Sequence, residues 1–411
     1  MPAIAYQYDD DTRDILAGLE RFLKVEVFAR HQANERLLSD SRYTYTEDGR
    51  YAPEVLKLIS EVRQASAKAG YYTLCVPTDL GGGGFGTVTY FALWERIFHL
   101  CGPHQWLGHF LASHWSKGPS PALAGLSPSL RERLLPGLNA GELTLCFALS
   151  EPGAGSDALA LKTKAVADGD DWILSGGKIW TTNSPYADYA MVFAITDPEA
   201  LAEKRGGISL FLVPTNAPGF QIERVIRMWG STGGDEAILH FDNIRLGPEM
   251  VVGKLGRGFD VAMLGIGLGR LYNAARAVGL GRWALEIALE YSKVRKTQGK
   301  AISTYQGVSF PLAESAMELH AAHLMSLNTA QLMDQGHKAT KEIAMSKAFA
   351  TQAGARAVDR AIQTHGAMGF TNEMHLTEAY TILRKNQVSD GTNEILRRNI
   401  AKSLLAGDTD L

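Results

Sequence analysis

Apolar residues follow a helical spacing near the start of the chain, a strand-like spacing in the middle and a helical spacing again towards the end. Residues 12–25 and 53–70 carry apolar side chains three and four positions apart, as Val55, Ile59 and Val62 illustrate. This pattern indicates helices that bury one face. The glycine run 81–84 interrupts it and predicts a loop. A further apolar stretch, 90–115, is rich in aromatic residues and histidine. The chain up to about residue 144 therefore reads mostly as helix.

The pattern changes near Leu143 and keeps its new form to about Gly253. Short apolar runs are separated there by turn residues, for example 162–166 and 172–174 on either side of an Asp-Gly-Asp turn. Further runs cover 189–195, 208–213 and 237–241. Short strands at this spacing predict a small β-barrel or sandwich.

Helical spacing returns from Asp260 onwards. Residues 271–291, 311–335 and 339–365 predict three long helices, and Gly336 is a plausible stop signal between the last two. Strands do not alternate with helices, which argues against a Rossmann fold. We therefore expect an α+β protein with three domains: a helical one over 1–144, a β domain over 145–253 and a helical one over 254–411.

Composition narrows the class of protein. With 411 residues, 45% hydrophobic and 21% charged, the chain has the profile of a soluble globular protein. Its net charge of −3 gives no reason to expect nucleic acid or an anionic membrane as partner. Three distant cysteines predict neither a disulfide framework nor a zinc site. Since no signal peptide or span of about 20 apolar residues is evident, we expect a cytoplasmic protein without membrane contact.

Two runs in the β segment carry candidate chemistry. Residues 147–157 read Phe-Ala-Leu-Ser-Glu-Pro-Gly-Ala-Gly-Ser-Asp, and glycines and hydroxyls there could let backbone N–H groups approach an anion. A tight surface turn explains the same run. Residues 178–183 read Lys-Ile-Trp-Thr-Thr-Asn, and an indole beside a hydroxyl could bind a planar heteroaromatic ring. A tryptophan in a strand is also an ordinary core residue.

Together, in this order and spacing, these two runs resemble the flavin-binding part of acyl-CoA dehydrogenases. Residues 295–300, Arg-Lys-Thr-Gln-Gly-Lys, match the family's Arg-Lys-Thr-aromatic-Gly-Lys run. Residues 363–370 match its Gln-x-x-Gly-Gly-x-Gly-aromatic run. Four motifs in the family's order cover nearly the whole chain. The resemblance implies an N-terminal helical domain, a middle β-barrel and a C-terminal four-helix bundle.

The resemblance also implies FAD as cofactor. Trp180 would pack beside the flavin ring, Thr182 would face N5 and Ser156 would contact the pyrophosphate. Some matching positions in the family reach FAD from a neighbouring subunit, so a homo-oligomer, dimer or tetramer, is expected. Arg295 could pair there with phosphate oxygens, although a solvated cation after a helix explains it as well. The implied FAD contacts are Phe147, Leu149, Ser150, Gly155, Ser156, Trp180, Thr182, Arg295, Thr297, Gln298, Gln363, Gly366, Ala367 and Thr392.

Asp390 is the candidate catalytic residue. The run 388–395, Val-Ser-Asp-Gly-Thr-Asn-Glu-Ile, resembles the family's C-terminal catalytic loop, where a glutamate before Gly-Thr usually removes the substrate α-proton. A branch of the family places the base before an arginine on an earlier helix, and the matching residue here is Gly269. Asp390 could instead cap the helix that follows it. The substrate contacts implied by the resemblance are Ser156, Arg270, Ser389 and Gly391.

The chain departs from the family pattern at several positions. Gln298 replaces an aromatic ring, Ala367 replaces a glycine, and Ser389 stands where a tyrosine is common. The run 229–234 lacks an arginine often found there. The shorter Asp390 withdraws the carboxylate by about a bond length, and a misplacement of about 1 Å can slow a reaction 100-fold. The rings of His99, His104, Trp106, Phe110 and Trp115 lie where the family builds its pocket floor, and ordinary helix packing explains them equally well.

The expected function is FAD-dependent α,β-dehydrogenation of an acyl-CoA thioester. Asp390 would act as the α-proton base and electrons would pass to an electron-transfer flavoprotein. One alternative is a flavin oxidase or monooxygenase on the same scaffold. Another is a non-redox role with FAD as a structural element. Oxygen consumption without an added acceptor separates the first two.

Overall fold

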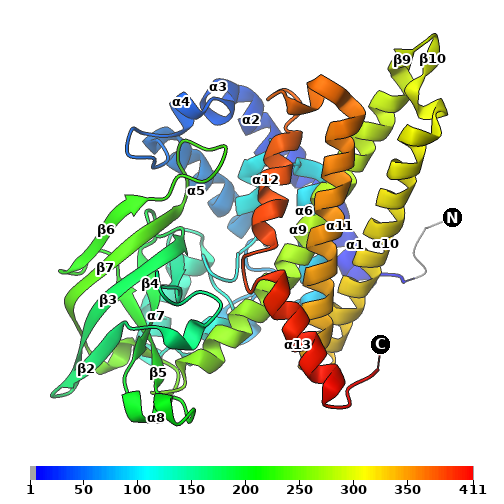
Figure 1. Cartoon of the computed structure of the whole chain (residues 1–411). Helices are drawn as coiled ribbons and strands as arrows, with labels where there is room; N and C mark the ends of the chain where they lie inside the picture. The colour runs from blue at the N-terminus through cyan, green and yellow to red at the C-terminus, as the bar shows by residue number, and fades with distance from the viewer. Residues whose placement is uncertain (1–5, 411) are drawn as a thin grey trace. The chain divides into compact units, whose positions relative to one another are not determined.

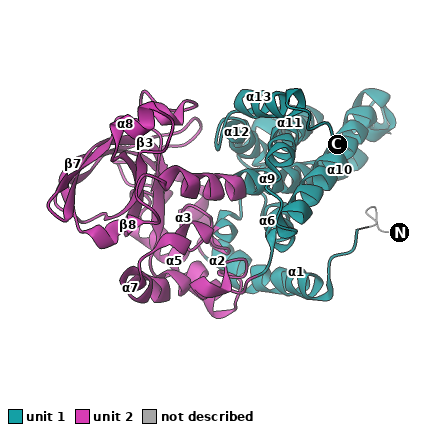
Figure 2. Ribbon diagram, turned by 90° about the horizontal axis from the view of Figure 1, so that it is seen from below, with its two compact units in different colours: residues 1–33, 85–109, 270–411 teal, residues 34–84, 110–269 magenta. Residues whose placement is uncertain are grey.

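The computed structural model describes residues 6–410, and the chain divides into two compact units. Unit 1 contains residues 1–33, 85–109 and 270–411, and unit 2 contains residues 34–84 and 110–269 (Figure 2). Residues 1–5, in the segment where no signal peptide is predicted, lie outside the described residues. Helices precede and follow a middle sheet (Figure 1), which confirms the α+β class. The division of the chain at 144 and 253 stays a prediction.

Unit 1 is helical apart from one short hairpin. Helix α11 contacts α10, α12 and α13, and α10 also contacts α6. Helices α9 and α11 approach closely because Gly354 has no side chain: a Cβ there would lie 2.5 Å from the carbonyl oxygen of Ala277. Helix α9 begins in unit 2 and ends in unit 1. The elements are α1 Asp10–Phe22, a π-helical turn Leu23–Phe28, α2 Ala29–Ala33, α6 Thr87–Cys101, α9 Gly258–Val294, β9 Lys296–Thr297, β10 Lys300–Ala301, α10 Gln306–Asp334, α11 Thr340–His365, α12 Leu376–Asn386 and α13 Asn393–Leu405.

The long predicted helices of unit 1 are confirmed, but the apolar stretch 90–115 is only partly helical. Helix α6 ends at Cys101, where Gly102 adopts a φ of 56° and donates its N–H to the oxygen of Phe98. Pro103 follows, and neither residue type continues a helix readily. Within residues 6–410, none of the helices combines the length and apolar character needed to cross a bilayer.

Unit 2 contains one eight-stranded sheet and several short helices. The strand order is β6-β7-β3-β2-β4-β5-β8, and β1 pairs in parallel with β4. Strand β3 is the longest and carries two irregularities in its pairing with β7. The elements are α3 Glu35–Ser39, α4 Ser41–Thr44, α5 Pro53–Lys68, α7 Pro128–Asn139, β1 Leu145–Ala148, β2 Lys164–Asp168, β3 Asp171–Thr182, β4 Tyr189–Ile195, α8 Pro198–Ala202, β5 Ile208–Pro214, β6 Phe220–Val225, β7 Glu236–Leu246 and β8 Val251–Val252.

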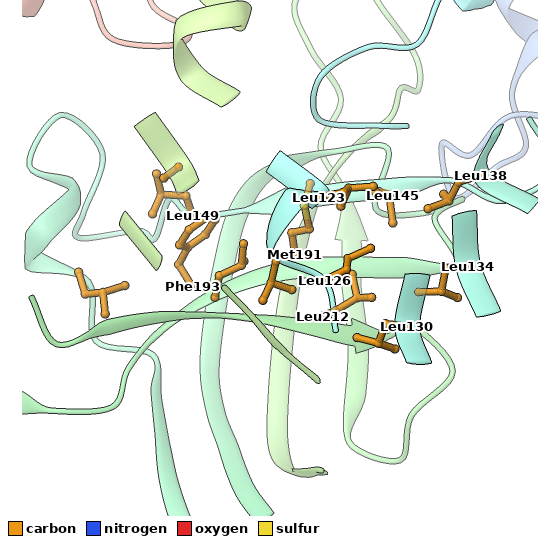
Figure 3. Packing of buried hydrophobic residues seen from close by; sticks show 14 of the residues in the cluster. Leu123, Leu126, Leu130, Leu134, Leu138, Leu145, Leu149, Met191, Phe193 and Leu212 are labelled. Carbon is orange, nitrogen blue, oxygen red and sulfur yellow. The ribbon is translucent and has the colours of Figure 1, made fainter. Parts of the chain in front are cut away.

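A leucine cluster anchors the sheet of unit 2. Leu130, Leu134 and Leu138 recur every four residues on one face of α7 and join Met191 and Phe193 of β4 in a buried core (Figure 3). Fully burying each such side chain contributes about 1.5–3 kcal/mol. The same cluster includes Leu145 and Leu149, so it fixes β1 and the first residues of the loop after it.

Candidate active site

The two motifs of the β segment lie side by side in unit 2. The N–H of Ile179 in β3 donates to the carbonyl oxygen of Ser150 at 2.9 Å. The ammonium group of Lys178 donates to the carbonyl oxygen of Leu149 at 3.0 Å. The loop after β1 is therefore attached directly to β3.

A buried ion pair fixes this loop. Lys178 is 0% exposed and its Nζ lies 2.8 Å from Oε1 of Glu151. Glu151 also accepts hydrogen bonds from the N–H groups of Lys162 at 2.6 Å and Thr163 at 3.0 Å. Burial lowers the pKa of Lys178 to about 8, and its bond to Glu151 opposes the shift. Burial raises the pKa of Glu151, but its hydrogen bonds from Lys178 and Thr163 outweigh this and lower it. The pair is therefore charged near neutral pH.

Trp180 is not a core residue. It lies between Lys178 and Thr181, where the register of β3 against β7 shifts. Its φ of 62° is left-handed, and the side chain is 54% exposed. The shift turns the indole out of the regular alternation of the strand. Thr182, two residues on, pairs with Glu236 in β7 and is partly exposed. An accessible ring and a nearby hydroxyl fit a planar heteroaromatic group such as a flavin.

The glycine turn of the first motif is exposed. Glu151 and Ala154 form an isolated bridge, and a Cβ placed on Gly153 or Gly155 would meet nothing within 4 Å. Ser156 is exposed as well. Anion binding here therefore stays a prediction beside the surface-turn explanation.

The ring of Phe147 packs against other aromatic rings of unit 2. Its centroid lies 4.8 Å from that of Trp115 and 4.8 Å from that of Phe193. Packing occupies part of this ring, which stays partly exposed, so a cofactor contact through the backbone of Phe147 stays a prediction. Trp115 also packs under Gly265, since a Cβ there would lie 2.6 Å from its ring. Helix packing therefore accounts for Trp115.

Asp390 lies in unit 1 at the turn between α12 and α13. Its φ is 53°, a left-handed conformation that aspartate tolerates better than most residues. Nδ2 of Asn273 donates to its Oδ2 at 2.7 Å, and Nε of Arg270 donates to its carbonyl oxygen at 3.0 Å. Lys347 donates to the carbonyl oxygen of Gly391 at 2.9 Å. Helices α9 and α11 thus hold both the side chain and the backbone of this turn.

The environment of Asp390 makes its carboxylate more basic. Burial raises the pKa of Asp390, while Lys347, Arg270 and the hydrogen bond from Asn273 oppose the rise without cancelling it. Burial lowers the pKa of Lys347 to about 8. A carboxylate whose pKa is raised towards neutrality is better suited to accept a proton from carbon.

The helix-capping explanation for Asp390 is wrong. Oγ1 of Thr392 accepts the hydrogen bond from the N–H of Ile395 at 3.2 Å and caps α13. Within residues 6–410, the N–H of Asp390 donates to no acceptor and its Oδ1 accepts from no donor. Both atoms remain available for a ligand. Ser389 and Gly391 flank them and are partly exposed.

The two remaining motifs lie at one end of the helices of unit 1. The rings of Tyr291 and His365 stack with centroids 4.4 Å apart, which brings the ends of α9 and α11 together. Arg295 joins α9 to the β9–β10 hairpin, which contains Thr297 and Gln298, and all three residues are exposed. The exposed residue Gln363 lies in the last turn of α11, and the exposed residues Gly366 and Ala367 follow that helix directly. The solvated-cation explanation for Arg295 stays open.

Four residues of these sites were given no role from the sequence: Glu151, Lys178, Asn273 and Lys347. Asn273 had a usable signal, because it follows Arg270 by three positions on a helix and so shares its face. Lys347 is 0% exposed within an alanine-rich helix. Only its burial, which the sequence does not reveal, distinguishes it from a surface lysine.

Comparisons with known proteins agree with this arrangement. Residues 146–244 match the family model for the acyl-CoA dehydrogenase middle domain, and residues 256–405 match that for the acyl-CoA dehydrogenase C-terminal domain. An acyl-CoA dehydrogenase of Bacillus subtilis is 35% identical over 340 residues, 83% of this chain and 88% of the relative. The caffeyl-CoA reductase-Etf complex subunit CarC of Acetobacterium woodii is 30% identical over 381 residues, 93% of this chain and 97% of the relative.

A solved structure extends the match to the fold. The crystal structure of acyl-CoA dehydrogenase from Geobacillus kaustophilus superposes with a TM-score of 0.84 at 26% identity, covering 98% of this chain and 100% of that one.

Proposed function

Because this chain belongs to the acyl-CoA dehydrogenase family and is an oxidoreductase with FAD as cofactor, we propose that it dehydrogenates an acyl-CoA thioester between Cα and Cβ. Asp390 is the base that removes the α-proton. The observation that carries the proposal is the turn at Asp390: α9 holds its carboxylate and carbonyl group, α11 holds the carbonyl group of Gly391, and Oδ1 and the backbone N–H of Asp390 have no partner within residues 6–410.

The chemistry assigned to this turn needs both free atoms. An α-proton beside a thioester is weakly acidic, and a hydrogen bond to the thioester oxygen stabilises the charge that develops there. The N–H of Asp390 can donate that bond, and such a preorganised donor contributes about 3–4 kcal/mol in well-studied enzymes. The raised pKa of the carboxylate favours its acceptance of the proton. Arg270 and Lys347 fix the two carbonyl groups that follow the N–H, which limits rotation of these peptides.

Residues of unit 2 suit the flavin. Trp180 offers an exposed ring and Thr182 a hydroxyl, while the Lys178–Glu151 pair fixes the backbone from Leu149 to Glu151. When bound, FAD supplies the acceptor for the hydride that leaves Cβ. The backbone of the loop after β1 and the side chains of Trp180 and Thr182 are proposed to hold its ring, with Ser156 near the pyrophosphate.

We further propose that the protein is a homo-oligomer, a dimer at least and a dimer of dimers by expectation. The hairpin of Arg295 and the turn after Gln363 would then reach the FAD of a second copy. An apolar stripe on α10 supports this proposal: Phe310, Met317 and Leu324 recur every seven residues and are 56%, 71% and 40% exposed. This alignment supports a protein contact, because contiguous exposed apolar surface is uncommon on proteins that stay monomeric.

The electron partner is proposed from a relative. The name of the Acetobacterium woodii relative places it in a complex with Etf, an electron-transfer flavoprotein, and describes a reductase. For this chain, an electron-transfer flavoprotein is the proposed partner. The reductase name also makes the reverse reaction, saturation of a 2-enoyl thioester, a second candidate. In that direction Asp390 would return its proton to Cα.

A panel of acyl-CoA thioesters, mixed anaerobically with the purified protein, tests the proposal. A substrate should bleach the flavin, and Asp390→Asn should lower the rate by several orders of magnitude while FAD and thioester still bind. Asp359→Asn on α11, an exposed carboxylate, is the matched control and should react like the wild type. Near wild-type bleaching by the Asp390→Asn variant would remove Asp390 as the base. Rapid oxygen consumption without an added acceptor would favour the oxidase alternative.

A further inference from the structure

We infer that Asn273 is a positioning residue for Asp390: its amide holds Oδ2 of the carboxylate and leaves Oδ1 to accept the substrate proton. The inference rests on the proposed role of Asp390 as the base. Asn273 and Asp390 are far apart in the sequence, with 117 positions between them.

The geometry gives Asn273 direct control of the carboxylate. Its side chain is buried, with 3% exposure for the residue, and Nδ2 lies 2.7 Å from Oδ2 of Asp390. Arg270, three residues earlier on α9, holds the carbonyl oxygen of the same residue at 3.0 Å. One helix face therefore anchors the side chain and the backbone of Asp390. An aspartate side chain has only two rotatable bonds, so these anchors leave the carboxylate little freedom.

An amide suits this task better than a further cation. Lys347 on α11 and Arg270 on α9 already face Asp390, and Glu394 on α13 partly opposes the lowering of the pKa of Lys347. A third positive charge would lower the basicity of the carboxylate. The neutral amide of Asn273 donates one hydrogen bond and adds no charge. It can orient the carboxylate while the carboxylate keeps most of the basicity that burial confers.

The short side chain explains why positioning matters here. An aspartate reaches about one bond length less far than a glutamate, and a misplacement of about 1 Å can cost 100-fold in rate. The αL backbone of Asp390, with φ at 53°, and the Asn273 contact set where Oδ1 lies. Loss of the contact would let the carboxylate rotate away from its productive position.

Asn273→Leu tests the inference, because leucine keeps nearly the same size and removes the donor. Rapid mixing with a saturating acyl-CoA under anaerobic conditions, from pH 5 to 9, gives the pH profile of flavin reduction. The variant should reduce its flavin about 10- to 100-fold more slowly. Its profile should move to higher pH, since a hydrogen bond that stabilises the charged carboxylate is lost.

FAD content and the affinity for the thioester should stay at wild-type values. Asn273→Gln keeps a donor and should recover part of the rate.

A second measurement does not depend on turnover. The infrared band of the protonated Asp390 carboxyl group, assigned by subtracting the spectrum of Asp390→Asn, should persist to higher pH in Asn273→Leu than in the wild type. If the leucine variant does not fold, Asn273→Ala is the smaller change and should show the same shift.

The outcomes separate this inference from the proposed function. If Asp390→Asn is inactive while Asn273→Leu keeps the wild-type rate and pH profile, Asn273 is only a buried partner and the inference is overturned. If Asp390→Asn itself reduces flavin normally, the proposed function fails first. A slower Asn273→Leu with a shifted profile and unchanged thioester affinity supports both.

Discussion

The N–H of Ile179 donates to the carbonyl oxygen of Ser150 at 2.9 Å, and the residues beside them, Lys178 and Glu151, form a buried ion pair at 2.8 Å. The two motifs of unit 2 are therefore joined by backbone and side chain at the same point. The backbone bond sets how the loop lies against β3. The ion pair raises the free energy needed to detach the loop from β3, because detachment would leave a buried charge without a partner.

Lys178→Met should destabilise the protein by about 3–5 kcal/mol, since it leaves the Glu151 carboxylate buried without its partner. Denaturant unfolding measures this loss, and the flavin absorbance of the purified protein should fall with it. Lys162→Met, an exposed lysine on the same loop, is the control and should change neither. Adding Glu151→Leu to the first variant should restore part of the stability. An unchanged unfolding midpoint for Lys178→Met would show that the pair does not hold the loop.

Trp180→Ala should leave stability within about 0.5 kcal/mol, because the side chain is 54% exposed. The visible spectrum and the retention of FAD should nevertheless change, since the ring is proposed to pack beside the flavin. Trp229 is the matched control: it is another exposed indole of unit 2, at 73%, and Trp229→Ala should leave the spectrum as it is. Equal effects of the two substitutions would argue against a flavin contact for Trp180.

Asp390→Asn should make the protein more stable near neutral pH. The folded state raises the pKa of this carboxyl group, so the protonated form fits the fold better than the charged form. The wild-type aspartate therefore contributes its full share to the free energy of unfolding at low pH, where it is protonated. That contribution is lost as the pH rises through the pKa of Asp390 in the folded state. Asparagine mimics the protonated form and also tolerates the αL backbone. Thermal melts between pH 4 and 8 should show an advantage that shrinks towards about pH 4. A variant less stable than wild type at every pH would contradict this.

Arg295→Ala should weaken FAD retention without affecting the fold of unit 1, because the hairpin is exposed. Repeated gel filtration with flavin quantification measures the loss. Arg205→Ala, an exposed arginine of unit 2, is the comparison and should keep its flavin. An unchanged flavin content in the Arg295 variant would favour the solvated-cation explanation.

Met317→Glu should shift the protein towards monomers, since it places a charge in the middle of the α10 stripe. Analytical ultracentrifugation reports the change in mass, and FAD should be retained less well. An FAD-saturated monomer of the wild type would rule out the second copy as a contributor to the site.

The sequence alone determined the order of helical and strand segments, because the spacing of apolar side chains reflects which face of a local element is buried. It also located the four motifs, since each is a continuous run of residues. Strand β4, predicted over 189–195, matches in full. The short strand β6 at 220–225 escaped prediction, and its burial pattern alternates only weakly.

The tertiary structure alone decided how single residues within those motifs are used. A register shift in β3 exposes Trp180, and Thr392 rather than Asp390 caps α13. Asn273 and Lys347 meet the turn at residues 390–391 across 117 and 44 positions of sequence. Such contacts depend on how α9, α11 and the turn before α13 pack together. Local patterns carry no record of that packing, because each helix needs only an apolar face to form, whichever partner later covers it.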